Sequence, residues 1–185
     1  VSLITKEIER RTAHTVLARP VSRWTFVTGK YVGLVVTLLV NAGVMSAGFL
    51  LLLAWRGDPV LQVLPALWLI AVELAVVTAF ALFFSAVSTS SIVGILFTLG
   101  LFVAGHLVWS LPLLAGRLTA AWARGVVWMA YYILPNLDRF NLRAAAVHGD
   151  PTPAGYVLAQ TLYGIGWAVI LVLAASFAFS RRDLT

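Results

Sequence analysis

The sequence lacks cysteine and has few charged residues, and each of these features excludes some classes of protein. With no cysteine among 185 residues, disulfide bonds and thiolate metal sites are excluded. Only 11% of the residues are charged, against about 25% in a soluble domain, while 61% are hydrophobic. This composition indicates a membrane protein.

Motifs for catalysis, metal binding and nucleotide binding are also absent from the sequence. There is no phosphate-binding Gly-x-x-x-x-Gly-Lys, no Gly-x-Ser-x-Gly and no His-Glu-x-x-His. His14 and His148 have no neighbours at metal-ligand spacing. We therefore expect no enzymatic activity, no metal site and no cofactor bound by this chain.

Four strongly apolar stretches occupy residues 31–55, 60–87, 92–111 and 154–180, and only Glu73 interrupts them with a charge. Each reaches the ~20 residues that a helix needs to cross ~30 Å of hydrocarbon. Lipid requires backbone groups to pair within their own segment, so these stretches are expected to be helices. We predict an all-α membrane protein with transmembrane helices at 31–55, 62–87, 92–111 and 155–179.

The net charge of +6 comes from basic residues that flank the apolar stretches. Such flanking charge encodes membrane topology and does not indicate a nucleic-acid partner. Six basic residues precede the first stretch, and Arg181 and Arg182 follow the last. We predict that both ends are cytoplasmic and that residues 112–153 are external, although this segment carries four arginines.

The first thirty residues predict a helix that breaks and then enters the membrane. Residues 6–17 have helical charge spacing, with Glu7 facing Arg11 at i,i+4. Pro20 ends this helix, and Ser22 can cap a new one that continues into the first membrane helix. A partner pushing on such an element would tilt that helix.

The external segment predicts short helices lying in the outer interface. Arg117, Arg124 and Tyr131 recur every seven residues and would share one helix face, opposite an apolar face that contains Trp122 and Met129. After Pro135, a second short helix is expected, capped by Asn136 and stopped by Gly149. Its apolar stripe would be Leu137, Phe140, Ala144 and Val147.

The N-terminal element resembles the signature of ABC-2 type transporter permeases. The family pattern has an acidic residue, a Thr, a Leu-rich turn, Pro-x-Ser-Arg, and Gly-Lys entering a membrane helix. Later landmarks agree with it: Leu-Phe-Phe-Ser at 82–85, Pro-Asn-Leu at 135–137 and Phe-Ser-Arg-Arg-Asp at 179–183. The matching signature residues are Glu9, Arg10, Thr12, Leu17, Pro20, Ser22, Arg23 and Lys30.

The resemblance implies that residues 1–30 are a coupling element moved by a separate ATP-hydrolysing subunit, with ATP and Mg on that subunit. It further implies two ATPase subunits, a second permease copy or close relative, and the bacterial inner membrane. Family members usually have six spans, with the signature between the second and third. Residues 1–4 then look like the end of a second helix, and roughly the first third of the protein would lie upstream. The branch that includes the permease of nitrous-oxide-reductase maturation is the most similar. The alternative for residues 1–30 is a positively charged anchor alone.

Glu73 is the one carboxylate inside an apolar stretch, about 16 Å past Gln62 at 1.5 Å per residue. A charge there costs a few kcal/mol, so Glu73 must face protein or water, or be protonated. Its candidate partners are Asn41, at similar depth in the first span, and His106 in the third. These three residues define a candidate translocation path. The alternative, which we favour, is a hydrogen-bonded carboxyl that fixes helix packing, with His106 serving in packing.

Two further functional classes remain as alternatives to the permease. An ion- or proton-coupled carrier would use Glu73 and His106, and would predict more polar groups and broken helices at the midplane. An intramembrane enzyme would need a nucleophile or metal set at depth, for which the same two residues are the candidates.

Overall fold

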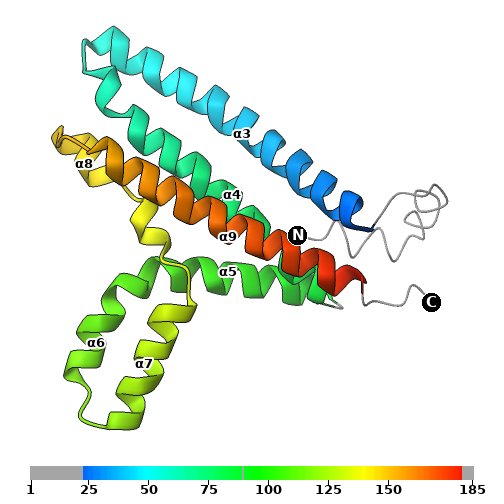
Figure 1. The fold of residues 1–185 in the computed structure, drawn as a ribbon. Coiled ribbons are helices and arrows are strands. Elements are labelled where there is room, and N and C mark those ends of the chain that lie inside the picture. The colour runs from blue at the N-terminus through cyan, green and yellow to red at the C-terminus, as the bar shows by residue number, and fades with distance from the viewer. Residues whose placement is uncertain (1–22, 89, 181–185) are drawn as a thin grey trace.

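Residues 23–88 and 90–180 are described by the computed structural model, and every regular element in this part of the chain is a helix (Figure 1). Four helical runs in it are long and apolar enough to cross a membrane, which confirms the predicted all-α membrane fold. They contain α3 (Arg23–Arg56), α4 (Leu64–Val87), α5 (Ser91–Leu107) and α9 (Ala154–Ser180). Shorter elements connect them: η1 (Val60–Gln62), η2 (Val108–Ser110), α6 (Leu111–Arg117), α7 (Ala121–Ile133), η3 (Leu137–Phe140) and α8 (Arg143–His148).

Helices α4 and α9 form the centre of the bundle and run in the same direction (Figure 1). Helix α3 returns antiparallel to α4 through a tight turn in which Gly57 adopts a φ of +80°, a value that favours glycine. Helix α5 also runs antiparallel to α4 and contacts it on another side, where the rings of Phe84 and Phe97 stack at 5.5 Å.

Close approach of α4 and α9 depends on a missing side chain. A Cβ placed on Gly164 of α9 would clash with the Val72 side chain of α4. Small residues at such contacts let membrane helices pack backbone to backbone. Around this contact lies the apolar core of the described bundle, which joins α3, α4, η3 and α9. Its largest fully buried members are Phe140, Phe179, Leu69, Leu137, Val27 and Val76.

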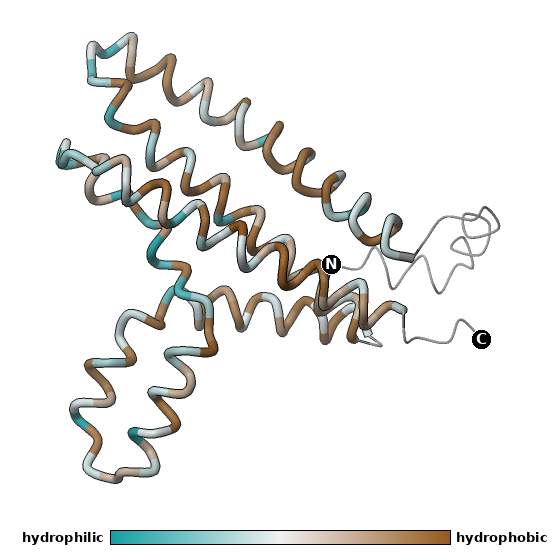
Figure 2. Tube along the Cα trace, in the orientation of Figure 1, coloured by the Kyte–Doolittle hydropathy of each residue, from teal (hydrophilic) through white to brown (hydrophobic). Residues whose placement is uncertain are grey.

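Much of the remaining helix surface is apolar and exposed, as lipid contact requires. Hydrophilic residues gather at the α3–α4 turn and around the segment between α7 and α9 (Figure 2). The long helices are therefore mainly apolar, and hydrophilic residues of the described chain gather at these two connections.

The third predicted span is bent where a single helix to residue 111 was expected. Helix α5 ends at Leu107, and the chain continues through η2 into α6. Pro112 lies in the first turn of α6. Proline has no N–H to donate to the carbonyl one turn earlier, so a regular helix cannot continue through this position.

The prediction that Arg117, Arg124 and Tyr131 share one helix face is wrong. Leu118 and Ala120 are extended, so Arg117 ends α6 while the other two lie on α7. Helices α6 and α7 pack against each other as a hairpin that projects away from the bundle (Figure 1). Trp122 and Met129 are exposed on α7, 77% and 62% respectively.

The prediction of one short helix after Pro135 is also wrong, because the structure has two separate elements there, η3 and α8. Asn141 is extended between η3 and α8, and its side-chain oxygen accepts the Arg143 N–H at 3.3 Å. A side chain that bonds its own backbone in this way interrupts a helix. Asn136 makes no capping bond, and Val147 is 82% exposed, whereas Leu137 and Phe140 are fully buried. The predicted stop at Gly149 is confirmed by its left-handed φ of +72°.

Candidate functional site

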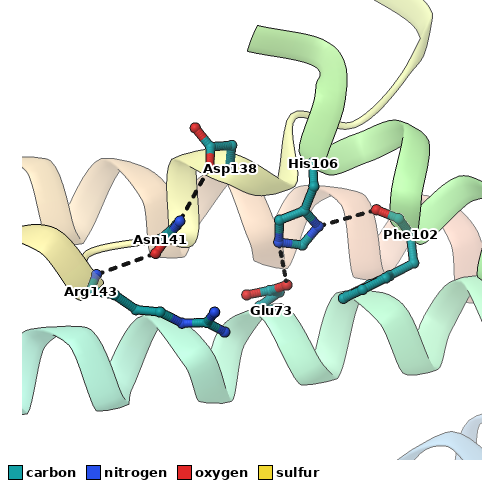
Figure 3. Close-up of polar contacts among 6 residues, drawn as sticks. All are labelled: Glu73, Phe102, His106, Asp138, Asn141 and Arg143. Atoms are coloured by element: carbon teal, nitrogen blue, oxygen red, sulfur yellow. Dashed lines mark hydrogen bonds and ion pairs between the residues drawn. The ribbon is translucent and has the colours of Figure 1, made fainter. Parts of the chain in front are cut away.

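Glu73 of α4 and His106 of α5 form the polar centre of the bundle (Figure 3). The Nε2 atom of His106 lies 3.3 Å from Oε1 of Glu73. The His106 side chain is 28% exposed and the Glu73 side chain is 12% exposed. Glu73 lies about 14 Å along α4 from Leu64, because nine residues separate them at ~1.5 Å each. The structure gives this carboxyl a partner from the neighbouring helix.

The second nitrogen of the His106 ring also has a partner. Nδ1 lies 3.1 Å from the backbone carbonyl oxygen of Phe102, one turn earlier on α5. The Phe102 ring packs against the imidazole with centroids 4.7 Å apart. Ring orientation is therefore set from both sides, by a backbone acceptor and by a carboxyl group.

The segment between α7 and α9 covers this pair. The side-chain amide of Asn141 donates to Oδ1 of Asp138 at 3.4 Å, and the guanidinium of Arg143 points toward Glu73 (Figure 3). Glycine at position 105 allows the approach, since a Cβ there would lie 2.7 Å from Cγ of Leu137 in η3. Carboxyl, imidazole and guanidinium groups from three elements thus meet at one place.

Helix α9 holds η3 in position through Tyr163. The backbone N–H of Asn136 donates to the Tyr163 hydroxyl at 2.9 Å, and the Arg139 guanidinium lies over its ring at 5.5 Å. The Tyr156 hydroxyl donates to the carbonyl of Arg139 at 2.8 Å. The Pro-Asn-Leu element that the sequence singled out therefore docks on the helix that follows it.

Asn41 does not pair with Glu73, so the prediction of that hydrogen bond is wrong. Its amide instead donates to the carbonyl of Thr37 on its own helix at 3.0 Å, and the residue is exposed. Only the first part of α3 packs closely on the bundle, through Val27 and the Tyr31 hydroxyl, which donates to the carbonyl of Ala75 at 3.2 Å. The structure unites two of the three predicted path residues.

An apolar groove of about 550 Å³ lies between α3, α4 and α9. Trp68 and Thr161 line it and are joined by a hydrogen bond of 2.9 Å. None of the described residues that line the groove carries a charge. It is suited mainly to apolar groups, and the Glu73–His106 pair is not among the described residues that line it.

Most of the predicted coupling residues lie outside the described part of the chain: Glu9, Arg10, Thr12, Leu17, Pro20 and Ser22. Arg23 begins α3, and Lys30 lies in its third turn with Nζ 5.5 Å from the Phe26 ring centroid. The helix that carries this end of the signature is therefore continuous with the first membrane helix.

No group of three or more metal-ligating side chains occurs within residues 23–88 and 90–180. The Glu73–His106 cluster is suited to holding protons and charge. Sequence reasoning missed Phe102, Asp138 and Arg143 as neighbours of the pair. Phe102 could have been found from the sequence, because it precedes His106 by one helical turn. Asp138 and Arg143 could not, because their positions depend on the path of the segment between α7 and α9.

These features define a multi-span helical membrane protein with a half-buried polar pair. The chain belongs to the ABC-2 transporter family: the family model described as "ABC-2 family transporter protein" matches residues 1–184. No curated protein and no solved structure matches it. The chain is accordingly a permease of an ABC transporter, a membrane transport component.

Proposed function

We propose that this permease moves a substrate across the bacterial inner membrane with energy from ATP hydrolysed by separate ATPase subunits. The observation that carries the proposal is the family match over residues 1–184, which includes the whole signature at its N-terminal end. The chain itself has no phosphate-binding motif, so the nucleotide and its Mg belong to a partner. Two ATPase subunits and two permease chains, identical or closely related, make up the proposed complex.

Residues 1–30 are proposed as the point of contact with the ATPase. Their charges suit docking on a soluble subunit, and α3 continues from Arg23 to Arg56 without interruption. A push delivered before residue 23 is then applied to a single rigid lever. Because only the first part of α3 packs closely on the bundle, the rest of this helix is able to move. Resemblance in sequence alone supports the further assignment to the branch with the permease of nitrous-oxide-reductase maturation.

Co-purification of the ATPase with the full-length permease tests the proposal. Glu9→Lys and Pro20→Leu should each reduce the ATPase recovered, because the first reverses a proposed docking charge and the second removes the proline predicted to separate the two helices. Asp58→Lys is the matched control, since it makes the same charge reversal at the exposed α3–α4 turn. Recovery equal to wild type in both signature variants would contradict the proposal.

A proton-coupled carrier is the second candidate function, and the Glu73–His106 contact at 3.3 Å is the observation in its favour. Buried carboxyl and imidazole groups are common parts of proton relays. Collapse of the proton gradient by an ionophore in vesicles that hold ATP separates the two functions. Transport that continues favours the ATP-driven permease, and transport that stops favours the carrier.

A further inference from the structure

The contacts of His106 fix where its protons lie. A backbone carbonyl only accepts hydrogen bonds, so the 3.1 Å contact with Phe102 places a proton on Nδ1. A neutral imidazole has a single N–H, which leaves a lone pair on Nε2 facing Glu73 Oε1 at 3.3 Å. If the Glu73 carboxylate were ionised, its oxygen and the Nε2 lone pair would both be hydrogen-bond acceptors and would repel each other. A favourable contact at this distance needs one more proton between the two atoms.

We propose that Glu73 and His106 hold one proton between them, and that this shared proton ties α4 to α5. The proton lies either on the carboxyl group or on Nε2. In both cases the pair as a whole is uncharged, as a neutral acid with a neutral imidazole or as carboxylate with imidazolium. A net-neutral pair is the arrangement that hydrocarbon surroundings tolerate.

The other charges around the pair do not replace this proton. Arg143 on α8 and Asp138 on η3 lie near the pair (Figure 3), but no ion-pair contact joins Arg143 to Glu73 in the described chain. Helix α9 carries no charged side chain between Ala154 and Ser180. Of the charged groups that act on Glu73, His106 is the one with an ion-pair contact to it in the described chain.

A direction of pH dependence follows from the proton count. Rising pH removes the shared proton and leaves the carboxylate facing the Nε2 lone pair, so the contact is lost. As long as the pair keeps its shared proton, the contact remains. The tie between α4 and α5 therefore opens on the alkaline side, while the stacked rings of Phe84 and Phe97 hold the other end.

Glu73→Gln tests the shared proton directly, because its amide N–H donates to Nε2 and does not titrate. The thermal unfolding midpoint of the full-length permease is measured in lipid nanodiscs from pH 6 to pH 10. We expect the wild-type midpoint to fall below that of Glu73→Gln as pH rises, and the two to converge at low pH. Parallel profiles for the two proteins would overturn the proposal.

His148→Gln is the matched control. Nδ1 of His148 also contacts a carbonyl one turn earlier, that of Ala144 at 2.8 Å, but no carboxylate lies within ion-pair distance of it in the described chain. This variant should reproduce the wild-type pH profile. A change in profile equal to that of Glu73→Gln would assign the pH dependence to histidines in general and contradict the proposal.

Nitrogen NMR of isotopically labelled wild-type protein provides a test that needs no variant of Glu73, with the His106 signal assigned from its absence in His106→Gln. At neutral pH we expect Nδ1 to be protonated and Nε2 to show a strong hydrogen bond. A ring protonated only on Nε2 would make it a simple donor to an ionised Glu73 and would overturn the proposal. Neither measurement depends on the ATPase, so failure here leaves the proposed transport function intact.

Discussion

The indole Nε1 of Trp68 on α4 donates to the hydroxyl oxygen of Thr161 on α9 at 2.9 Å. The same hydroxyl donates to the carbonyl of Val157 at 2.8 Å, so both of its hydrogen-bonding roles are used. This bond joins the two central helices near their first turns, where the apolar groove is lined by both residues. A polar contact here thus fixes the register of α4 against α9 in surroundings that are otherwise apolar.

Replacement of Thr161 measures the strength of this bond. Thr161→Val keeps the shape but removes the acceptor, so the free energy of unfolding should fall by about 0.6–1.7 kcal/mol, the range for polar contacts between membrane helices. Thr161→Ser retains the hydroxyl and should stay close to wild type. Unfolding in mixed micelles provides the measurement, and equal losses in both variants would exclude the hydrogen bond as the cause.

Gly164→Ala should separate α4 from α9. The new methyl would overlap the Val72 side chain and press on the Phe140 ring, whose nearest atom lies 3.2 Å from the added carbon. Overpacking of this kind destabilises by about 1–3 kcal/mol.

Gly166→Ala is the control for that variant, because it lies on the same helix with nothing within 4 Å of an added Cβ. It should be neutral, or stabilising by about 0.5–1 kcal/mol from helix propensity alone. Thermal unfolding of the two variants in parallel makes the comparison. A loss of stability in Gly166→Ala as large as in Gly164→Ala would contradict the packing account.

The predicted topology is open to cysteine labelling, since the sequence contains no native cysteine. Arg117→Cys and His148→Cys lie at exposed positions in the segment predicted to be external, and they should react with a membrane-impermeant thiol reagent on intact cells. Ser88→Cys, in the connection predicted to be cytoplasmic, should react only after the cells are opened. The reverse pattern would invert the topology.

The sequence predicted the parts of the fold that follow from composition. A long apolar stretch in lipid must pair its backbone groups within itself and therefore forms a helix. For this reason α3, α4, α5 and α9 were all expected as helices. Gly149 was expected as a stop because glycine tolerates a left-handed conformation. The helices predicted within residues 112–153 were wrong, because helical periodicity is local. It does not reveal the extended residues that interrupt this segment, Leu118, Ala120 and Asn141.

The site was predicted in part for a related reason. Depth along a helix can be counted from the sequence, so Glu73 and His106 were both expected inside the membrane. Rotation about the helix axis and the choice of neighbour cannot be counted in that way, and Asn41 was wrongly offered as an equal partner for Glu73. The decisive feature is that α3 packs closely only near its start, which turns Asn41 outward.

The central claim is that ATP hydrolysed on a partner drives this permease, and the most direct measurement is ATP hydrolysis by the purified complex in liposomes. We predict hydrolysis that co-purifies with the full-length permease, falls in Glu9→Lys and Pro20→Leu, and is unchanged in Asp58→Lys and in the presence of a proton ionophore. Two results together would contradict the account. The permease would be purified without any ATPase, and its transport in liposomes would stop when the ionophore is added.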